Sequence, residues 1–387
     1  MSDHQVSAPN LAELQTHTSA KWRGFPQDVL PLPVAEMDYP VAQPIRAVLT
    51  EMVAKSDLGY LDSIPELGLG FQKFAAERWG WNVDPLQVRA ATDVGVAVVE
   101  ILRVFTNPGD SILVSSPVYH NFYTWIDETK LNKVDVPFER TGDESHNPWV
   151  INWDGIEKAY ASGIKVHLLC SPHNPLGRIY NKEELLRITA LAKKHNVIVI
   201  SDEIHAPLTY KGETFVPYLS LGKEAEEVGI TVTAASKGWN IAGLKCAIIV
   251  TQNEAMHLRL NNLATAMPYR ASLLGGFATA VAFSEGGVWL DSVLENLDNN
   301  RKMIKDLLDA KLPSVRYHIP QNGYLAWLDL ESLQLGEDPN ATLIEKGRVA
   351  FNAGHTFGAQ CSQYVRLNFA TSPTIITEAI ERIARSI

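Results

Sequence analysis

Cysteine is scarce in this chain of 387 residues, and its three cysteines include no Cys-x-x-Cys pair. An odd number without such spacing gives no sign of a disulfide framework or a metal site, and we predict neither. Two of the three, Cys170 and Cys246, lie in apolar, strand-like stretches. We therefore expect buried, unreactive thiols in a reducing cytoplasm.

The sequence also lacks a basic stretch and a long apolar one. Its net charge is −10, without any run rich in lysine or arginine, whereas nucleic acids and anionic membranes require a basic face. Residues 1–10 are polar and hold no apolar core of a signal peptide. The longest nearly apolar stretch, 271–283, is too short to span a bilayer, so we expect a buried helix there. The composition predicts a soluble, globular chain without nucleic-acid or membrane partners.

The middle of the chain alternates short β-branched runs with helical patterns. Residues 181–195 carry apolar side chains at helical spacing, and Asn181 with Glu184 resembles a capping box. Strands that alternate with helices predict a mostly parallel sheet covered on both faces. The predicted strands are 111–115, 165–170, 197–201, 230–234 and 246–251.

The pattern changes after about residue 285. Apolar residues over 288–297 predict a long amphipathic helix, and the stretches 324–329 and 364–368 read as strands. The proline-rich beginning of the chain has no long period, so we expect it to pack on this later part. The predicted units are an N-terminal segment (1–48), a large domain (49–285) and a smaller α+β domain (286–387).

Three polar motifs follow three of the predicted strands: SPHNPLG at 171–177, SDEIH at 201–205 and SKGWN at 236–240. In open α/β sheets, ligands bind beyond the carboxyl ends of the strands. These motifs therefore place polar groups where a ligand is expected. The candidate side chains are the amide of Asn174, the carboxylate of Asp202 and the amine of Lys237.

Each of these residues alone also has an ordinary structural explanation. Lys237 could lie on a solvated loop, and Asp202 could cap the following helix. Asn174 precedes a proline and could belong to an ordinary turn. A partly buried lysine, however, has a lowered pKa and as a neutral amine forms Schiff bases. The combination at successive strand ends favours a functional site.

The three motifs, in this order, resemble those of fold-type I pyridoxal-phosphate (PLP) enzymes of the class I/II aminotransferase superfamily, over nearly the whole chain. The resemblance implies the PLP-dependent transferase fold, with a large, mostly parallel seven-stranded sheet domain and a smaller α+β C-terminal domain. It implies that Lys237 holds PLP as a Schiff base. It also implies that Asp202 faces the pyridine nitrogen and that Asn174 contacts the 3′-oxygen of the ring.

The same resemblance implies phosphate contacts. Val94 and Gly95, expected just before a helix at 96–104, match a turn that offers backbone N–H groups to the phosphate. Ser236 and Lys245 match further phosphate contacts, with lysine where many relatives have arginine. Lysine still serves there as a point charge.

Four more residues are assigned by the resemblance. Tyr119 matches the aromatic residue that stacks on the ring beside the substrate, although in isolation it reads as a core tyrosine. Tyr60 matches a tyrosine that reaches the phosphate of a neighbouring subunit, which implies a homodimer with shared active sites. Arg366 matches the arginine that grips the substrate carboxylate; an internal ion pair is the alternative. His205 is expected beside the cofactor, where it could support Asp202 through hydrogen bonds.

Local resemblance further favours the MalY/PatB group of cystathionine β-lyases. The stretches that carry it are AEMDYP at 35–40, SDEIH at 201–205, SKGWNIAGL at 236–244 and YLAWLDL at 324–330. One departure is visible, because Gly238-Trp239 stands where many members have a small or hydroxyl residue followed by phenylalanine. This change could reshape the pocket.

The group resemblance implies a PLP-dependent C–S β-lyase that acts on a small amino-acid thioether. L-Cystathionine, cysteine or an S-substituted cysteine would give a thiol such as homocysteine, together with pyruvate and ammonia. Methionine biosynthesis, sulfur scavenging and detoxification all remain open as the physiological role. The first alternative is an aminotransferase that uses an L-amino acid and a 2-oxo acid. The second, a regulatory protein on a PLP scaffold, is disfavoured because Lys237 is retained and no basic segment is added.

Overall fold

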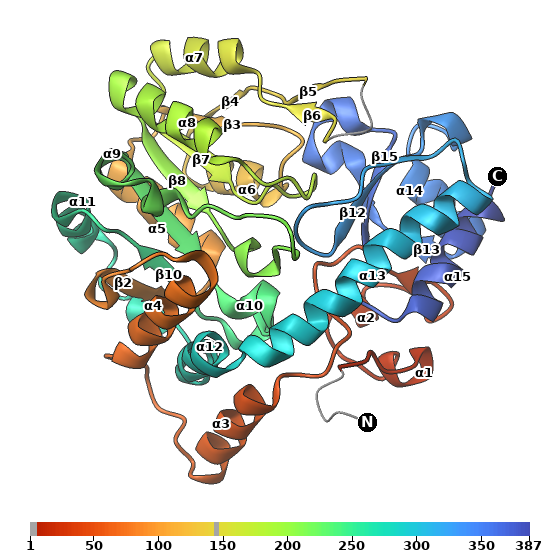
Figure 1. Ribbon diagram of the computed structural model, residues 1–387, viewed down its shortest axis with the longest axis horizontal. Helices are drawn as coiled ribbons and strands as arrows, with labels where there is room; N and C mark the ends of the chain where they lie inside the picture. Colours follow the sequence, from red (N-terminus) through yellow and green to blue (C-terminus); the bar gives the residue numbers. More distant parts are fainter. Residues whose placement is uncertain (1–5, 143–146) are drawn as a thin grey trace.

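A seven-stranded sheet forms the centre of the larger part of the molecule (Figure 1). This computed structural model describes residues 6–142 and 147–387. The strand order is β2-β10-β9-β8-β7-β3-β4; β10 is antiparallel to both of its neighbours, β2 and β9, and all other neighbouring strands are parallel. The mostly parallel seven-stranded sheet is thus confirmed. The strands are β2 (Val88–Ala91), β3 (Ser111–Val114), β4 (Asn132–Asp135), β7 (Val166–Cys170), β8 (Ile198–Asp202), β9 (Gly229–Thr233) and β10 (Ala247–Val250).

The central strands are buried on both faces, which is why they read as short apolar runs rather than alternating ones. Successive residues enter different cores: Leu168 packs in the cluster that includes α5, and Leu169 packs in the cluster that includes α8. The helices of this part are α3 (Gln43–Ala54), α4 (Pro65–Trp79), α5 (Val94–Phe105), α6 (Asn121–Glu128), α7 (Trp153–Ala161), α8 (Lys182–His195), α9 (Lys223–Val228), α10 (Ala235–Gly238), α11 (Glu254–Arg259) and α12 (Leu273–Glu285).

Helix α8 shows why local sequence predicts element boundaries well here. Asn181 Oδ1 accepts the Glu184 N–H at 2.8 Å, and Glu184 Oε2 accepts the Asn181 N–H at 2.9 Å, so the predicted capping box is confirmed. The helix ends at Asn196, whose left-handed conformation (φ 55°) is typical of a helix end.

The C-terminal part is built on a four-stranded antiparallel sheet in the order β11-β12-β15-β14. Helix α13 meets α12 at 78° and runs along the small sheet to pack against α15 (Figure 1). These elements are β11 (Arg316–Tyr317), β12 (Leu325–Asp329), β14 (Asn352–Ala353), β15 (Tyr364–Asn368), α13 (Gly287–Lys311), α14 (Pro339–Thr342) and α15 (Pro373–Ala384).

The N-terminal segment lies against this C-terminal part. Its strand β1 (Leu30–Pro31) pairs in parallel with β13 (Val349–Ala350), and Asp38 N–H donates to Ala370 O at 2.8 Å. Lys21 forms a fully buried ion pair with Asp38 at 2.7 Å. The segment is thereby fixed where it passes the ligand cavity described below.

The long apolar stretch and the cysteines of the sequence lie in buried parts of the structure. No single helix in 6–142 or 147–387 is long and apolar enough to cross a membrane, and only the bent pair α12–α13 reaches that length and composition together. Helix α12 is mostly buried, as predicted for 271–283. All three cysteines are free and buried, also as expected.

Candidate active site

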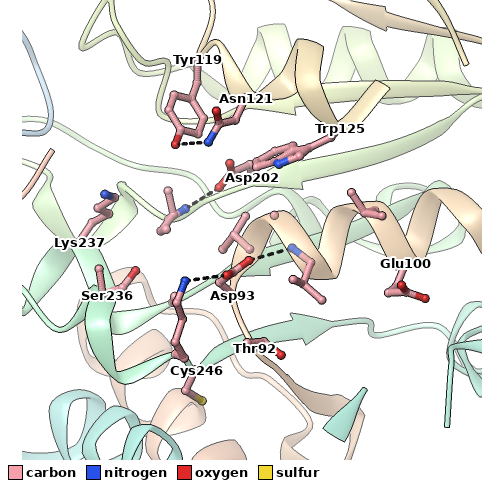
Figure 2. Close-up of a pocket in the computed structure, with 18 of the residues that line it drawn as sticks. Thr92, Asp93, Glu100, Tyr119, Asn121, Trp125, Asp202, Ser236, Lys237 and Cys246 are labelled. Carbon is pink, nitrogen blue, oxygen red and sulfur yellow. Dashed lines mark hydrogen bonds and ion pairs between the residues drawn. The ribbon is translucent and has the colours of Figure 1, made fainter. Parts of the chain in front are cut away.

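A cavity of about 530 Å³ lies beyond the carboxyl ends of β7, β8 and β9 (Figure 2). These strands are neighbours in the sheet, so the motifs that follow them meet at one edge. Asn174, Asp202 and Lys237 all line the cavity. The expectation that these three motifs come together is met by the geometry.

Lys237 lies in the one-turn helix α10, directly after β9, and its side chain points into the cavity (Figure 2). Its Nζ donates a hydrogen bond to Ala35 O at 2.8 Å. Burial, and after it the positive charge of Arg366, lower the pKa of Lys237 to about 8. A substantial share of the amine is therefore neutral near physiological pH, which is the nucleophilic form.

Asp202 is the last residue of β8 and is only 4% exposed. Its Oδ1 accepts the Ile204 N–H at 3.1 Å. Burial raises the pKa of Asp202 to about 7, whereas the Ile204 hydrogen bond and the charge of Lys237 oppose the rise. A ligand that brought a positively charged N–H to this carboxylate would restore its ordinary ionisation.

His205 also lines the cavity and is buried. Burial, followed by the charges of Lys237 and Arg366, lowers the pKa of His205 to about 3, so the ring is neutral. Within the described ranges no hydrogen bond joins His205 to Asp202, whose Oδ1 accepts the Ile204 N–H. The support of Asp202 by His205 is therefore not seen.

The start of α5 also lines the cavity. The prediction that residues 94 and 95 precede this helix is wrong, because Asp93 caps it and the helix begins at Val94. Asp93 Oδ1 accepts the Val96 N–H at 2.8 Å. The N–H groups of Val94 and Gly95 belong to the first turn and have no partner within the helix, so they remain suited to an anion.

Gly95 is required at this position by close packing. A Cβ atom there would approach Trp125 Nε1 to 2.9 Å. Ser236 and Lys245 line the same cavity, and Lys245 Nζ forms an ion pair with Asp93 Oδ2 at 3.1 Å. The predicted phosphate-binding residues are thus gathered in one place, together with one carboxylate that was not predicted.

Arg366 lies in the middle of β15 and is 2% exposed. It donates to Asn174 Oδ1 at 3.1 Å and to Pro33 O at 2.9 Å, while its Nε has no hydrogen-bond partner among the residues that the structure describes. Burial lowers the pKa of Arg366 to about 10. No salt bridge in the described part of the chain joins Arg366 to a carboxylate, so the alternative of an internal ion pair is not observed. A buried guanidinium with an unused donor is suited to an anionic ligand.

The two predicted tyrosines lie in different surroundings. Tyr119 lines the cavity, and its hydroxyl oxygen accepts a hydrogen bond from Asn121 Nδ2 at 2.7 Å (Figure 2). Burial raises the pKa of Tyr119, so the hydroxyl stays protonated. Tyr60, by contrast, is 88% exposed and does not line this cavity.

Sequence reasoning missed Asp93, the Ala35 carbonyl and Arg270, which line the same cavity. An aspartate directly before a helical run is a common N-cap, and this signal could have identified Asp93. The carbonyl of Ala35 could not be identified from the sequence, because a backbone carbonyl is present at every residue. Trp239 does not line the cavity; it is fully buried, and its Nε1 donates to Gly286 O at 3.0 Å.

The fold and this geometry define an α/β protein with a cavity between a helix start, a buried carboxylate and a buried lysine, a setting suited to an anionic ligand. No cluster of three or more potential metal ligands occurs in 6–142 and 147–387. The sequence model of the aminotransferase class I and II family matches residues 28–383, and the chain belongs to this family.

Individual relatives refine this assignment. Cystathionine beta-lyase of Corynebacterium glutamicum is 36% identical, over 97% of this chain and 98% of the relative. Cystathionine beta-lyase PatB of Bacillus subtilis is 29% identical over 92% of each. The solved structure of cystalysin from Treponema denticola, which contains a pyridoxal 5′-phosphate cofactor, superposes with a TM-score of 0.90 at 26% identity, covering 100% of this chain and 98% of that one. The predicted resemblance is confirmed.

Proposed function

We propose that the protein is a PLP-dependent carbon–sulfur β-lyase. It cleaves L-cystathionine, cysteine or an S-substituted cysteine to a thiol, pyruvate and ammonia. The observation that carries the proposal is a lysine of lowered pKa in one cavity with Asp202 and the start of α5. The cystathionine beta-lyases among the relatives support the choice of reaction.

The residues of the cavity fit PLP. The amine of Lys237 would bond to the aldehyde, and Asp202 would accept the proton of the pyridine nitrogen. The cavity residues that would hold the remaining parts of the cofactor are Val94, Gly95, Ser236 and Lys245 at the phosphate, Asn174 at the ring oxygen and Tyr119 against the ring face.

The bound cofactor supplies an electron sink for negative charge at the substrate Cα. Arg366 binds the substrate carboxylate with the donors that now contact Asn174 and Pro33, and with its unpartnered Nε. With the substrate in place, the neutral amine of Lys237 would remove the Cα proton as a base. The Cβ–S bond then breaks, the thiol leaves with a proton, and water completes the release of pyruvate and ammonia.

We also propose a homodimer in the cytoplasm. Tyr60 and Leu86 are 88% and 84% exposed, which is unusual for side chains of this size. Leu86 lines a surface cavity together with Met267 and with Asp62, which is two residues from Tyr60 in the sequence. A second copy that covered this surface would bring Tyr60 to the partner's phosphate site. Three free, buried cysteines agree with a reducing compartment.

The deciding experiment is the release of pyruvate from L-cystathionine by the PLP-loaded protein without any 2-oxo acid. Equal amounts of pyruvate, ammonia and homocysteine are expected, and Lys237→Ala should abolish them. Product that formed only after a 2-oxo acid was added would replace the lyase proposal by transamination. The Lys305→Ala variant, which changes an exposed lysine of α13, is the matched control.

A further inference from the structure

Asp93 places a negative charge in the part of the cavity that would receive the cofactor phosphate. It lies directly before Val94 and Gly95, whose N–H groups begin α5. Its Oδ1 is bonded to Val96 N–H at 2.8 Å and its Oδ2 to Lys245 Nζ at 3.1 Å. The carboxylate of Asp93 therefore already accepts from a backbone N–H of the helix start and from the amine of Lys245, which are the two kinds of donor that a bound anion would use here.

We propose that Asp93 weakens the binding of the cofactor phosphate and makes PLP exchangeable. This inference rests on the proposed placement of the phosphate at the start of α5. A phosphate monoester carries a charge of about −1.5 to −2 at neutral pH. To bind it, Lys245 either leaves Asp93 or is shared with it, and in both cases two like charges lie side by side.

The capping role of Asp93 does not require its charge. Asparagine caps helices as well as aspartate does, because the side-chain oxygen alone accepts the N–H. Asp93→Asn therefore keeps the bond to Val96 and removes only the charge and its pairing with Lys245. The side chains of Asp93 and Lys245 are 40% and 56% exposed, so solvent screens the repulsion and the effect is moderate.

The test measures the dissociation constant of PLP and its rate of loss from the holoenzyme on dilution. Asp93→Asn should tighten binding about three- to thirty-fold, and the gain should shrink as salt is raised. Lys245→Met should weaken binding. The matched control is Asp338→Asn, another N-cap aspartate whose Oδ1 accepts Ala341 N–H at 3.2 Å, and it should change neither value.

Two results would overturn the proposal. Weaker PLP binding by Asp93→Asn would mean that Asp93 positions Lys245 for the phosphate, and unchanged binding would mean that the carboxylate does not sense the cofactor. If the wild-type protein did not show the visible absorption of bound PLP, the proposed function itself would be refuted. Circular dichroism of each variant shows whether α5 and the rest of the fold are intact.

Discussion

Lys237, Asp202 and His205 line one cavity, and burial is the largest cause of the pKa shift of each. Burial disfavours charge, so it lowers the pKa of the lysine and the histidine and raises that of the aspartate. At neutral pH, Lys237 and Asp202 are therefore close to their pKa values and each is partly charged, whereas His205 is neutral. A ligand that supplies both an aldehyde and a cationic ring nitrogen compensates Lys237 and Asp202 at once.

The first residue-scale prediction concerns the pH dependence of Lys237. The rate at which the PLP-free protein binds PLP covalently should rise with pH through about 8, because only the neutral amine reacts. Arg366→Leu removes a positive charge that lowers this pKa, so the midpoint should move to higher pH. Stopped-flow absorbance measures it, with Arg385→Leu, an exposed arginine, as control. An unchanged midpoint in Arg366→Leu would show that the two cations do not interact.

The second residue-scale prediction concerns Glu203, which is buried beside Asp202. Its Oε1 accepts hydrogen bonds from Ser201 Oγ at 3.0 Å and Tyr218 N–H at 2.8 Å, while Oε2 has no partner within 6–142 and 147–387. Burial raises its pKa from 4.5 to about 8. The folded protein keeps this proton where the unfolded chain has lost it, so wild-type stability falls as pH rises from 4.5 to about 8 and is level above.

Glu203→Gln cannot ionise and escapes this loss. The unfolding free energy of the variant minus that of the wild type should grow over the same pH window, by up to about 5 kcal/mol, and then stay constant. Urea denaturation at a series of pH values provides the measurement. Glu337→Gln, at an exposed position, should show no such trend. A difference that fell with rising pH would mean that Glu203 is stabilised as a carboxylate.

Sequence reasoning reached the side chains of the site but not all of its partners. Asn174, Asp202 and Lys237 were predictable because each follows an apolar strand and belongs to a distinctive motif. The acceptor of the Lys237 hydrogen bond was not, since Ala35 contributes a carbonyl from 202 residues away. Every residue type has a backbone carbonyl, so only the folded structure shows which carbonyl accepts the hydrogen bond.

At the scale of elements, residues 33–38 form a strap between the two parts of the site. Pro33 O accepts from Arg366, and Ala35 O accepts from both Lys237 and Tyr324. Asn240 fixes the strap from the other side, since Met37 N–H donates to its Oδ1 and its Nδ2 donates to Met37 O, both at 2.8 Å. The strap thus couples α10 to β15.

The element-scale prediction is that Asn240 holds the strap in place. Asn240 has φ 57°, a conformation that glycine adopts freely, so Asn240→Gly removes the two hydrogen bonds without backbone strain. Hydrogen exchange at the Met37 amide should accelerate about ten-fold or more, as the loss of about 1–2 kcal/mol implies. Asn240→Asp keeps the acceptor for that amide and should lie between glycine and wild type. Equal exchange in all three proteins would show that other contacts fix the strap.

The strands were predictable in the interior of the sheet and not at its edges. β7 and β9 are fully buried and appear as apolar runs, whereas the edge strand β4 (Asn132–Asp135) is mostly exposed and polar. The other edge strand, β2 (Val88–Ala91), is only half-buried and was missed for the same reason. The antiparallel direction of β10 was also not predictable, because a buried strand has the same residue pattern in either direction.

At the scale of the whole molecule, the site combines segments from the entire length of the chain. Ala35, Asp202 and Arg366 come from the N-terminal segment, the large sheet and the small sheet. Tyr60 would add a second copy of the chain to this set. When an active site combines residues of two subunits, two different inactive variants can restore activity in a mixed dimer. A site built from one chain cannot be restored in this way.

The whole-molecule prediction uses this property. Lys237→Ala removes the lysine from its own site, whereas Tyr60→Ala would damage only the site of the partner. In a hybrid dimer of the two variants, one site then carries both defects and the other carries neither. Equal mixing and reassembly should make half of the dimers hybrids and recover about a quarter of wild-type pyruvate release. Two variants within one domain of the same chain, Lys237→Ala and Asp202→Ala, should recover none. If the first pair also recovered none while size-exclusion chromatography showed mixed dimers, Tyr60 would act within its own chain or not at all.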